Sequence, residues 1–392
     1  MSRSLRATAT VEANPRLAAP AHSRARARRV AFLVSHFPSG GAQEIMTDIA
    51  DGLRMEGCEV RLFALYPLAD APSAAKTRLP WSWLVDRKPA SVGGLLKLAR
   101  ALLRAFAATR PDAVVSALPA ANIAAIVGAR LAAPRAKVII AHHSPVQTHD
   151  RLFNFIDGRL GGWRNVAAIV SVSDVVASSL EGKPAAYRAK RRTIRNALPP
   201  DIERFIATLA TARPAGASTR VVVATGRLAE QKNYPALLRA AARMPNVTVR
   251  IVGGGEDEAK LKALARELGV EGRVEFLGRR SREETLKILA AGAVFAQPSL
   301  FEGHSLALIE AAKLGVPIVT SNAPEQVEGV TAADGSRCAL LVDPQDDASL
   351  AREILRLLDR PEVYAHWQAR ARRLGDDGGF RRVVSAYAAL MR

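Results

Sequence analysis

The chain has 392 residues, 49% of them hydrophobic and 24% charged, which is enough apolar material for two packed domains and argues against wholesale disorder. The 56 Lys and Arg outnumber the 37 Asp and Glu, so the formal charge of +19 favours phosphates, anionic lipid or nucleic acid as partners. Aromatic residues make up only 5%, and the chain has no zinc-finger or RNA-recognition spacing, which argues against nucleic acid. Two distant cysteines, Cys58 and Cys338, suggest neither a disulfide framework nor a thiolate metal site.

Residues 1–29 form the first segment, and they carry seven Arg against the single acid Glu12 without hydrophobic periodicity. We interpret them as a disordered basic tail, although an Arg-rich, acid-poor start is also typical of a transit peptide or of contact with an anionic membrane. No apolar run of 18 or more residues follows, and the start lacks the apolar centre of a signal peptide. The expected location is therefore the cytoplasm, with peripheral attachment to the inner face of the membrane as an open alternative.

The next segment alternates short apolar runs with helical patterns. An apolar run at 30–34 leads into Gly40 and Gly41 and then into a helical stretch through Ile45, Ile49 and Leu53. A helix is expected at 91–109, and further strands at 59–65, 113–116, 137–141 and 166–172. This alternation predicts a parallel, doubly wound sheet in a domain spanning 30–205.

The helix expected at 91–109 supports two interpretations. Basic side chains on it and two tryptophans before it form a pattern typical of a membrane-docking surface: Trp81, Trp83, Lys97, Arg100 and Arg104. A helix that covers a sheet needs an apolar stripe in any case, and this one has it in Leu95, Leu98, Leu102 and Phe106. The charge of the whole chain tilts the interpretation slightly towards the membrane.

Residues 206–218 lack periodicity and are rich in Ala, Thr, Pro and Gly, so we interpret them as a linker. A second series of strands and helices then begins, which predicts a second Rossmann-like domain over 219–375. Its strands are expected at 220–225, 247–252, 273–277, 293–297, 317–320 and 338–342, and its helices from 235 and at 257–268, 282–290, 305–314 and 349–359. Residues 376–392 should form a C-terminal helix that packs back on the first domain.

The segment 298–310 carries the sharpest chemical pattern, because it runs from a strand into a helix at the ligand-binding edge of a doubly wound sheet. Gly303 permits close backbone approach, and Ser305 is suited to cap the helix, so the amides of Ser305 and Leu306 can face an anion. Glu310 stands in an apolar helix and needs partners, which the two hydroxyls of a ribose or a structural Lys or Arg could supply. Glu302, eight positions earlier, favours the ribose.

The segment 225–233 repeats the arrangement of strand, glycine and helix, with Arg227 and Lys232 expected beside the same corner. A phosphoryl leaving group needs positive charge as its bond breaks, from a metal ion or from fixed Arg and Lys. The sequence contains no recognisable Asp/His metal cluster, so we expect side-chain cations and no metal ligands.

These segments together resemble the family 4 retaining glycosyltransferases of the GT-B fold, of the type that builds bacterial glycans. The resemblance covers about residues 30–390 and rests on the loop from Gly40 to Gln43, on Gly226 to Leu228 with Lys232, on the Glu302 and Glu310 pair and on the segment 315–319. It implies an α/β protein with two doubly wound Rossmann-like domains facing across a cleft. The N-terminal domain would bind the acceptor and the C-terminal domain the nucleotide-sugar.

The resemblance also implies roles for individual residues. Arg227 and Lys232 would hold the donor diphosphate and Glu310 the ribose, while Gly41 closes on the phosphates from the first domain. Either His142 or His143 would meet the donor sugar. His304 stands where such proteins often carry an aromatic or apolar residue, which leaves the identity of the sugar open. The implied catalytic residues are Glu302, His143, His142, Arg227 and Lys232, and the implied donor-binding residues are Gly40, Gly41, Gly226, Arg227, Lys232, Gly303, His304, Ser305, Leu306 and Glu310.

The expected function is therefore retaining transfer of a hexose or N-acetylhexosamine, without a cofactor, from a nucleotide-diphosphate sugar, most simply a UDP-sugar. The acceptor would be a glycan or a polyprenyl-linked lipid in polysaccharide or lipopolysaccharide biosynthesis. Two alternatives remain: a nucleotide-sugar epimerase of similar fold, and a non-catalytic scaffold that binds polyanions or lipid. A dehydrogenase fits poorly, because Gly253 to Gly255 lack the third glycine of the dinucleotide fingerprint and a ribose-binding acid about 20 residues on.

Overall fold

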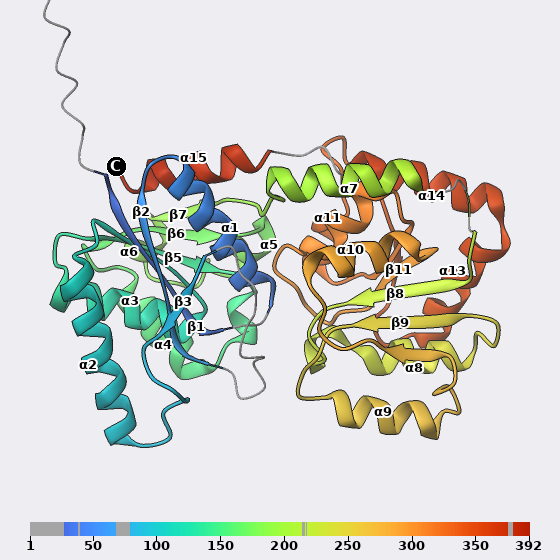
Figure 1. The fold of residues 1–392 in the computed structure, drawn as a ribbon, viewed down its shortest axis with the longest axis horizontal. Coiled ribbons are helices and arrows are strands. Elements are labelled where there is room, and N and C mark those ends of the chain that lie inside the picture. The colour runs from blue at the N-terminus through green and yellow to red at the C-terminus, as the bar shows by residue number, and fades with distance from the viewer. Residues whose placement is uncertain (1–26, 38–39, 68–78, 214–215, 217, 375–378) are drawn as a thin grey trace, which may run out of the picture.

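The computed structural model describes residues 27–37, 40–67, 79–213, 216, 218–374 and 379–392, in two domains that lie side by side (Figure 1). Most of the expected basic tail lies outside these residues. The prediction that Arg29 belongs to the tail is wrong. Arg29 begins the first strand and pairs with Asp112, with Arg29 Nη2 lying 3.1 Å from Asp112 Oδ1. The main-chain amide of Arg29 also donates to Asp112, which extends the strand by one residue beyond the apolar run.

The N-terminal domain is built on a seven-stranded parallel sheet of order β3-β2-β1-β4-β5-β6-β7. Its strands are β1 (Arg29–Phe37), β2 (Glu59–Pro67), β3 (Trp81–Trp83), β4 (Ala113–Ala117), β5 (Lys137–His142), β6 (Val166–Ser171) and β7 (Arg191–Thr193). Its helices are α1 (Gly41–Met55), α2 (Val92–Thr109), α3 (Pro119–Ala132), α4 (Arg151–Leu160), α5 (Asp174–Ser178) and α6 (Ala185–Arg188), with a short 3-10 turn η1 (Val146–Thr148). The central strands are nearly continuous apolar runs because helices cover both faces.

The C-terminal domain repeats this plan with a six-stranded parallel sheet of order β10-β9-β8-β11-β12-β13. The strands are β8 (Val221–Thr225), β9 (Thr248–Val252), β10 (Val274–Phe276), β11 (Val294–Gln297), β12 (Ile318–Ser321) and β13 (Leu340–Val342). Its helices are α8 (Tyr234–Ala242), α9 (Glu258–Glu267), α10 (Arg282–Ala291), α11 (Leu306–Lys313), α12 (Pro324–Gly329), α13 (Asp347–Asp359) and α14 (Pro361–Leu374), with the 3-10 turn η2 (Glu230–Lys232). The fold predicted from the sequence, two doubly wound α/β domains, is confirmed.

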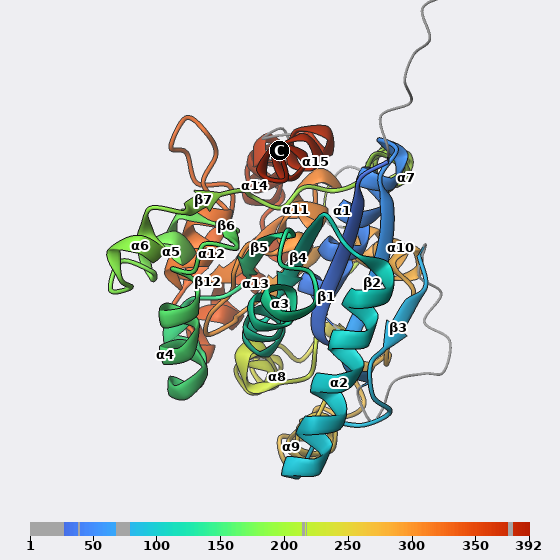
Figure 2. The same ribbon diagram turned by 90° about the vertical axis from the view of Figure 1, so that its left-hand side faces the viewer.

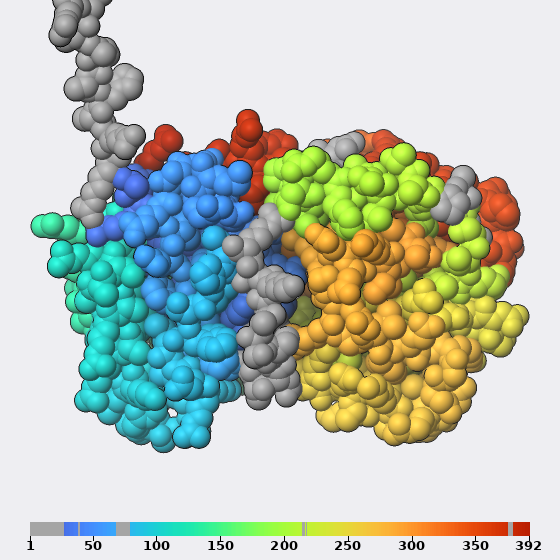
Figure 3. All heavy atoms as spheres, in the orientation of Figure 1, coloured from blue at the N-terminus to red at the C-terminus, as the bar shows by residue number. Residues whose placement is uncertain are grey.

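The linker expected at 206–218 is wrong over its first half. Residues 206–212 continue α7 (Pro200–Ala212), a helix whose buried Ile202 and Ile206 and half-buried Phe205 and Leu209 form one apolar stripe. The Ala- and Thr-rich composition hides this stripe in the sequence. Figure 3 shows α7 lying along the C-terminal domain next to the N-terminal one.

The last helix, α15 (Phe380–Leu390), follows the C-terminal domain in the chain but packs against α1 of the N-terminal domain (Figure 1). Gly52 of α1 makes this contact close, since a Cβ there would lie 2.5 Å from Val384 Cγ2. Phe380, Val383, Val384 and Tyr387 of α15 are all buried. The two domains are thus joined by two separate helical segments.

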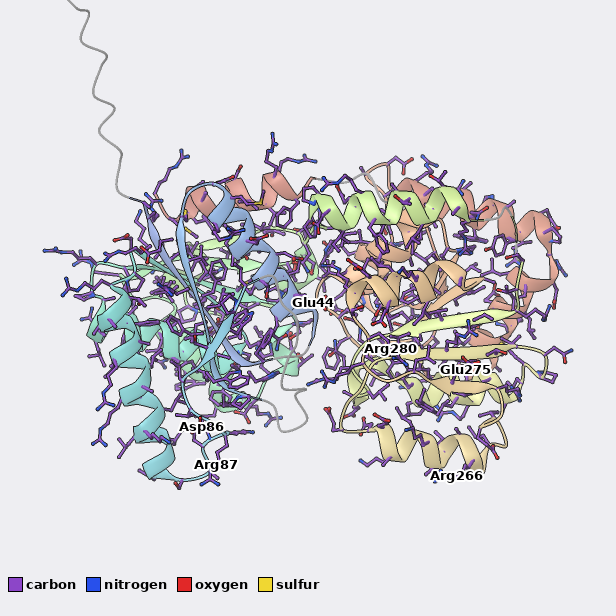
Figure 4. All side chains as sticks on the ribbon, viewed as in Figure 1. Glu44, Asp86, Arg87, Arg266, Glu275 and Arg280 are labelled. Carbon is purple, nitrogen blue, oxygen red and sulfur yellow. The ribbon has the colours of Figure 1, made fainter. Side chains whose placement is uncertain are left out.

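Helix α2 was predicted to be either a helix that covers the sheet or a surface that docks on a membrane. Leu102 and Phe106 in its second half are buried against the domain, as a sheet-covering helix requires. The first turns instead expose Val92, Leu95 and Leu96 by 73%, 57% and 52%, where the helix extends past the end of the sheet (Figure 2). Trp83 is also exposed, and the basic Arg87 lies in the loop before the helix (Figure 4).

The prediction that Trp81 belongs to a membrane-docking surface is wrong. The Trp81 ring stacks on Phe37 with centroids 4.9 Å apart, and its Nε1 donates to Thr47 Oγ1 at 3.1 Å. The indole packs against the core because β3, a three-residue edge strand not expected from the sequence, pairs with β2 and turns it inwards.

Candidate functional site

The carboxyl ends of β1, β5, β8 and β11 bring the predicted site residues to the junction between the domains. Gly303 packs tightly against the N-terminal domain, since a Cβ on Gly303 would lie only 2.1 Å from the carbonyl oxygen of His143. Asn196 Nδ2 donates to the carbonyl oxygen of His304 at 2.9 Å, beside this contact. The segment after β11 is thus held against the opposite domain by its backbone.

Lys232 and Glu302 form a nearly buried ion pair at this junction. Lys232 Nζ lies 2.7 Å from Glu302 Oε1, and the Ser299 hydroxyl donates to the same oxygen at 2.7 Å. Gly226 leaves room for the Lys232 side chain to reach Glu302. Its φ is 138°, and a Cβ there would lie 2.6 Å from Lys232 Cε. The structure therefore brings these three predicted residues together and shows why the loop needs glycine.

The glycines at 253–255 have a different explanation from a nucleotide-binding loop. A Cβ on Gly253 would lie 1.8 Å from the carbonyl oxygen of Gly226, and one on Gly255 would lie 2.4 Å from that of Leu228. Leu228 N also donates to the Gly254 carbonyl at 3.2 Å. These glycines let the two loops pack backbone to backbone, which fixes the position of Arg227 between them.

Arg227 is half-buried, and its charge acts on His36 of the N-terminal domain, a residue that sequence reasoning missed. Burial and the charges of Arg227 and Lys88 lower the pKa of His36 to about 4, so its ring is neutral near pH 7. Gln43 holds this ring, with its Nε2 lying 3.3 Å from His36 Nδ1 and donating to the His36 carbonyl at 3.1 Å. The signal that could have found His36 is its place at the end of β1, directly before the glycine loop.

Glu310 has the structural ion pair that was one of its two interpretations. Arg282 Nε donates to Glu310 Oε1 at 2.9 Å, and Arg282 Nη1 donates to Asp48 Oδ2 on α1 at 3.0 Å. Burial raises the pKa of Glu310, while the charge and hydrogen bond of Arg282 act against that rise. Neither Arg282 nor Asp48 was expected from the sequence, because no motif links residues 234 positions apart.

Ser305 and Leu306 lie where they were expected, at the N-cap and first residue of α11. The capping role of the Ser305 side chain was wrong, because its hydroxyl donates to Gln297 Oε1 at 3.1 Å instead of accepting from the helix. Gln297 offers this acceptor at the end of the preceding strand. The N-terminal amides of α11 thus have no side-chain cap from Ser305.

The structure distinguishes the two histidines after β5. His142 is buried in the N-terminal domain, where its Nε2 lies 2.8 Å from Tyr187 Oη, which donates to Asp157 Oδ2 at 2.9 Å. Lys183 Nζ donates to the same carboxylate oxygen at 2.9 Å. His143 is half-buried, touches Gly303 through its carbonyl, and has a pKa lowered to about 4 by burial and by His142. The main chain of His143 thus lies at the junction, whereas the His142 ring is bonded within the N-terminal domain.

His304 and the first glycine loop complete the predicted set. Burial lowers the pKa of His304 to about 4, and its buried Nδ1 has no hydrogen-bond partner among the described residues. Gly40 has φ of 95° and precedes α1. Gly41 is exposed, and a Cβ on it would meet no atom of the described residues within 4 Å.

A cavity of about 470 Å³ opens in the N-terminal domain beside η1 and α4. Its lining includes Val146, Arg151, Phe155, Arg159 and Lys183, from η1, α4 and the loop before α6. Val146 follows His143 by three residues, so their Cα atoms are within about 11 Å of each other. Within the described ranges, no three His, Cys, Asp or Glu side chains gather as a metal site, and no helix is long and apolar enough to cross a membrane.

Two protein-family models match successive parts of this chain. The model described as Glycosyltransferase Family 4 matches residues 39–201, and the model described as Glycosyl transferases group 1 matches residues 212–374. An uncharacterized glycosyltransferase of Haemophilus influenzae is 22% identical over 376 residues, which cover 93% of this chain and 100% of that protein. The lipopolysaccharide core biosynthesis glycosyltransferase LpsE of Rhizobium meliloti is 30% identical over 228 residues, 58% of this chain and 64% of LpsE.

Among solved structures, Anabaena Alr3699/HepE in complex with UDP and glucose is similar with a TM-score of 0.74. It is 20% identical, and the match covers 92% of this chain and 98% of that one. At this identity the likeness shows the fold, which is GT-B.

Proposed function

We propose, on the premise that this chain belongs to the family 4 glycosyltransferases of the GT-B fold, that it transfers a hexose or N-acetylhexosamine from a UDP-sugar to a growing glycan with retention of configuration. The UDP in the similar HepE structure supports the choice of nucleotide. The similarity to LpsE supports an acceptor in lipopolysaccharide or polysaccharide biosynthesis.

One observation carries the proposal: cations and carboxylates converge at one sheet edge that faces the opposite domain. Lys232 pairs with Glu302 at 2.7 Å, the charge of Arg227 acts on His36, and Glu310 accepts from Arg282, which also donates to Asp48 on α1. A nucleotide diphosphate needs positive charge for its phosphates and acceptors for its ribose hydroxyls. This edge offers both.

The proposed mechanism uses side-chain charge in place of a metal ion. Arg227 and Lys232 would neutralise the diphosphate as it leaves, and a leaving phosphate oxygen would take the proton of the acceptor hydroxyl attacking on the same face. Glu302 would hold Lys232 and contact the hexose, and His143 would lie near the reacting carbon. We assign no covalent nucleophile.

A donor screen by thermal unfolding tests this function. One class among UDP-, GDP- and ADP-sugars should raise the unfolding temperature, because a ligand at a hundred times its Kd stabilises the native state by about 2.7 kcal/mol. With that donor and an acceptor, the product should keep the anomeric configuration in a chelating buffer. Absence of stabilisation by every nucleotide-sugar would contradict the proposal, and isomerisation of the free donor without acceptor would favour the epimerase.

We propose that the cavity beside His143 receives the anionic part of the acceptor, such as the diphosphate of a polyprenyl-linked glycan. Arg151 and Arg159 are exposed on one face of α4 and line the cavity with Phe155. Replacing both arginines with glutamate should raise the KM for a phosphorylated acceptor about tenfold or more. The stabilisation by UDP should not change. Arg164→Glu, an exposed position in the same domain, serves as the control, and an unchanged acceptor KM in the double variant would exclude the cavity.

We further propose that the exposed start of α2 docks on anionic lipid at the inner face of the membrane. Apolar Val92, Leu95 and Leu96 lie beside basic side chains there, which is the composition of an interfacial helix. Replacing Leu95 and Leu96 with glutamate should abolish sedimentation with vesicles that contain anionic lipid. Leu131→Glu, at another exposed leucine, should leave this sedimentation intact. If both variants bound the vesicles equally well, α2 would not be the docking surface.

A further inference from the structure

One arginine, Arg282, contacts both domains and touches the carboxylate that the proposed function assigns to the ribose. Its Nε donates to Glu310 Oε1 within the C-terminal domain, at 2.9 Å. Its Nη1 donates to Asp48 Oδ2 on α1 of the N-terminal domain, at 3.0 Å. The side chains of Arg282, Glu310 and Asp48 are only 16%, 9% and 8% exposed. A single guanidinium therefore fixes two nearly buried carboxylates from different domains.

The chemistry of arginine suits this double contact. The guanidinium is planar and carries five N–H donors in a fixed fork, so two of its nitrogens can hold two carboxylates in a set relative position. Arg282 is itself held at the first residue of α10 by a capping box, in which Ser281 and Glu284 bond to each other's backbone amides. The base of the side chain is thus rigid, and the position of its fork follows from that of the helix.

The surrounding charges make the contact important for the approach of the domains. Glu44, one turn before Asp48 on α1, lies at the domain junction (Figure 4). The Glu44 side chain is exposed, and the charges of Arg282 and Glu310 act on it in opposite directions. The three carboxylates Glu44, Asp48 and Glu310 therefore share the field of one cation. Without that cation they would repel α1 from the C-terminal domain.

Helix α1 links this contact to the opposite end of the proposed donor site. It begins at Gly41, the residue that the family resemblance assigns to the donor phosphates, and Asp48 lies seven residues further, about 10 Å along the axis. A fixed distance between Asp48 and Glu310 consequently fixes where Gly41 stands relative to the ribose ligand. Arg282 determines that distance.

We propose, on the basis of the proposed function, that Arg282 is a positioning residue with two separable roles: its contact with Glu310 orients that carboxylate for the ribose, and its contact with Asp48 sets the approach of α1 that transfer requires. The asymmetry of the contact makes the proposal testable. Asp48 belongs only to the interdomain half, whereas Arg282 belongs to both halves.

Steady-state kinetics and calorimetric titration with UDP on the full chain separate the two halves. Asp48→Ala should lower kcat by about tenfold or more while the Kd for UDP stays within about threefold of the parent value. Arg282→Met should lower kcat and also raise the Kd for UDP about tenfold, because Glu310 loses its orientation. The matched control is Lys313→Ala, which removes an ion pair of 3.1 Å between α11 and Glu203 on α7 and should change neither quantity.

A conservative variant keeps the test decisive if Arg282→Met fails to fold. Arg282→Lys retains the charge but lacks the fork, so it should bind UDP better than Arg282→Met and still show the low kcat of Asp48→Ala. The proposal is overturned if Asp48→Ala keeps the parent kcat, or if Arg282→Lys matches the parent protein in both quantities. Glu310→Ala separates failure of the proposed function from failure of this inference. Unchanged UDP binding in Glu310→Ala would contradict the proposed function itself. Lost UDP binding in Glu310→Ala, together with parent values of kcat and Kd in the Arg282 variants, would contradict only the role of Arg282.

Discussion

Replacing Lys232 with methionine is expected to lower kcat by about a hundredfold or more, because a fixed cation at a leaving diphosphate acts mainly in the transition state. Methionine retains the length of the side chain and its packing beneath Gly226, where Lys232 Cε would lie 2.6 Å from an added Cβ. The variant therefore removes charge more than volume. Steady-state kinetics with the donor found in the thermal screen measure the effect.

The partner of Lys232 provides the control for this prediction. Loss of Lys232 also leaves Glu302 without its cation, and breaking a buried pair destabilises by roughly 3–5 kcal/mol. Adding Glu302→Gln to Lys232→Met removes the unpaired charge, so it should restore stability without restoring kcat. Lys262→Met, which breaks an exposed pair on α9, should have no effect on either quantity. Recovery of kcat in the double variant would show that Lys232 acts only by neutralising the Glu302 carboxylate.

Replacing Gly303 with alanine is expected to reduce kcat/KM by about a hundredfold or more, since a misplacement of about 1 Å at a reacting centre has effects of that size. The added Cβ would lie 2.1 Å from the His143 carbonyl oxygen and 2.7 Å from its carbon. Both atoms are backbone, so no rotamer change relieves the overlap, and the two domains must separate at the donor site. The same measurement on Gly272→Ala, where an added Cβ meets nothing within 4 Å, gives the control.

The thermal unfolding temperature helps to interpret the Gly303 result. If the overlap only keeps the domains apart, Gly303→Ala should lose activity while each domain remains folded. Stabilisation by UDP should then persist, because the nucleotide ligands lie mainly in the C-terminal domain. A kcat/KM close to that of the parent protein would mean that the contact between Gly303 and His143 is not needed for transfer.

The sequence predicted the parts of this molecule that depend on local pattern. Apolar runs such as 30–34 and 113–116 are buried on both faces and fall within β1 and β4, and Ser305 stands at a helix start as expected. The edge strands β3 and β7 were missed because each has only three residues and little apolar pattern. The second half of α7, residues 206–212, was taken for a linker because Ala and Thr obscure the stripe that includes Ile202 and Ile206.

The site was predictable where neighbouring strands of one sheet end and unpredictable where two domains meet. Glycine, cation and carboxylate at 226, 232 and 302 follow strand ends, so the edge of the sheet brings them together. The partners Asp48 and Arg282 belong to separate domains, and their pairing follows from how the domains pack. His142 and His143 differ in sequence by nothing that reveals which one is turned into the network with Tyr187.

The most direct test of the central claim is a crystal structure of the full chain with UDP bound. We expect diphosphate oxygens of UDP within about 2.7–3.2 Å of the Arg227 guanidinium and Lys232 Nζ, with the ribose hydroxyls donating to Glu310. Gly41 should face the same phosphates from the N-terminal domain. A nucleotide bound away from Arg227, Lys232 and Glu310, or one whose ribose leaves Glu310 untouched, would contradict this claim.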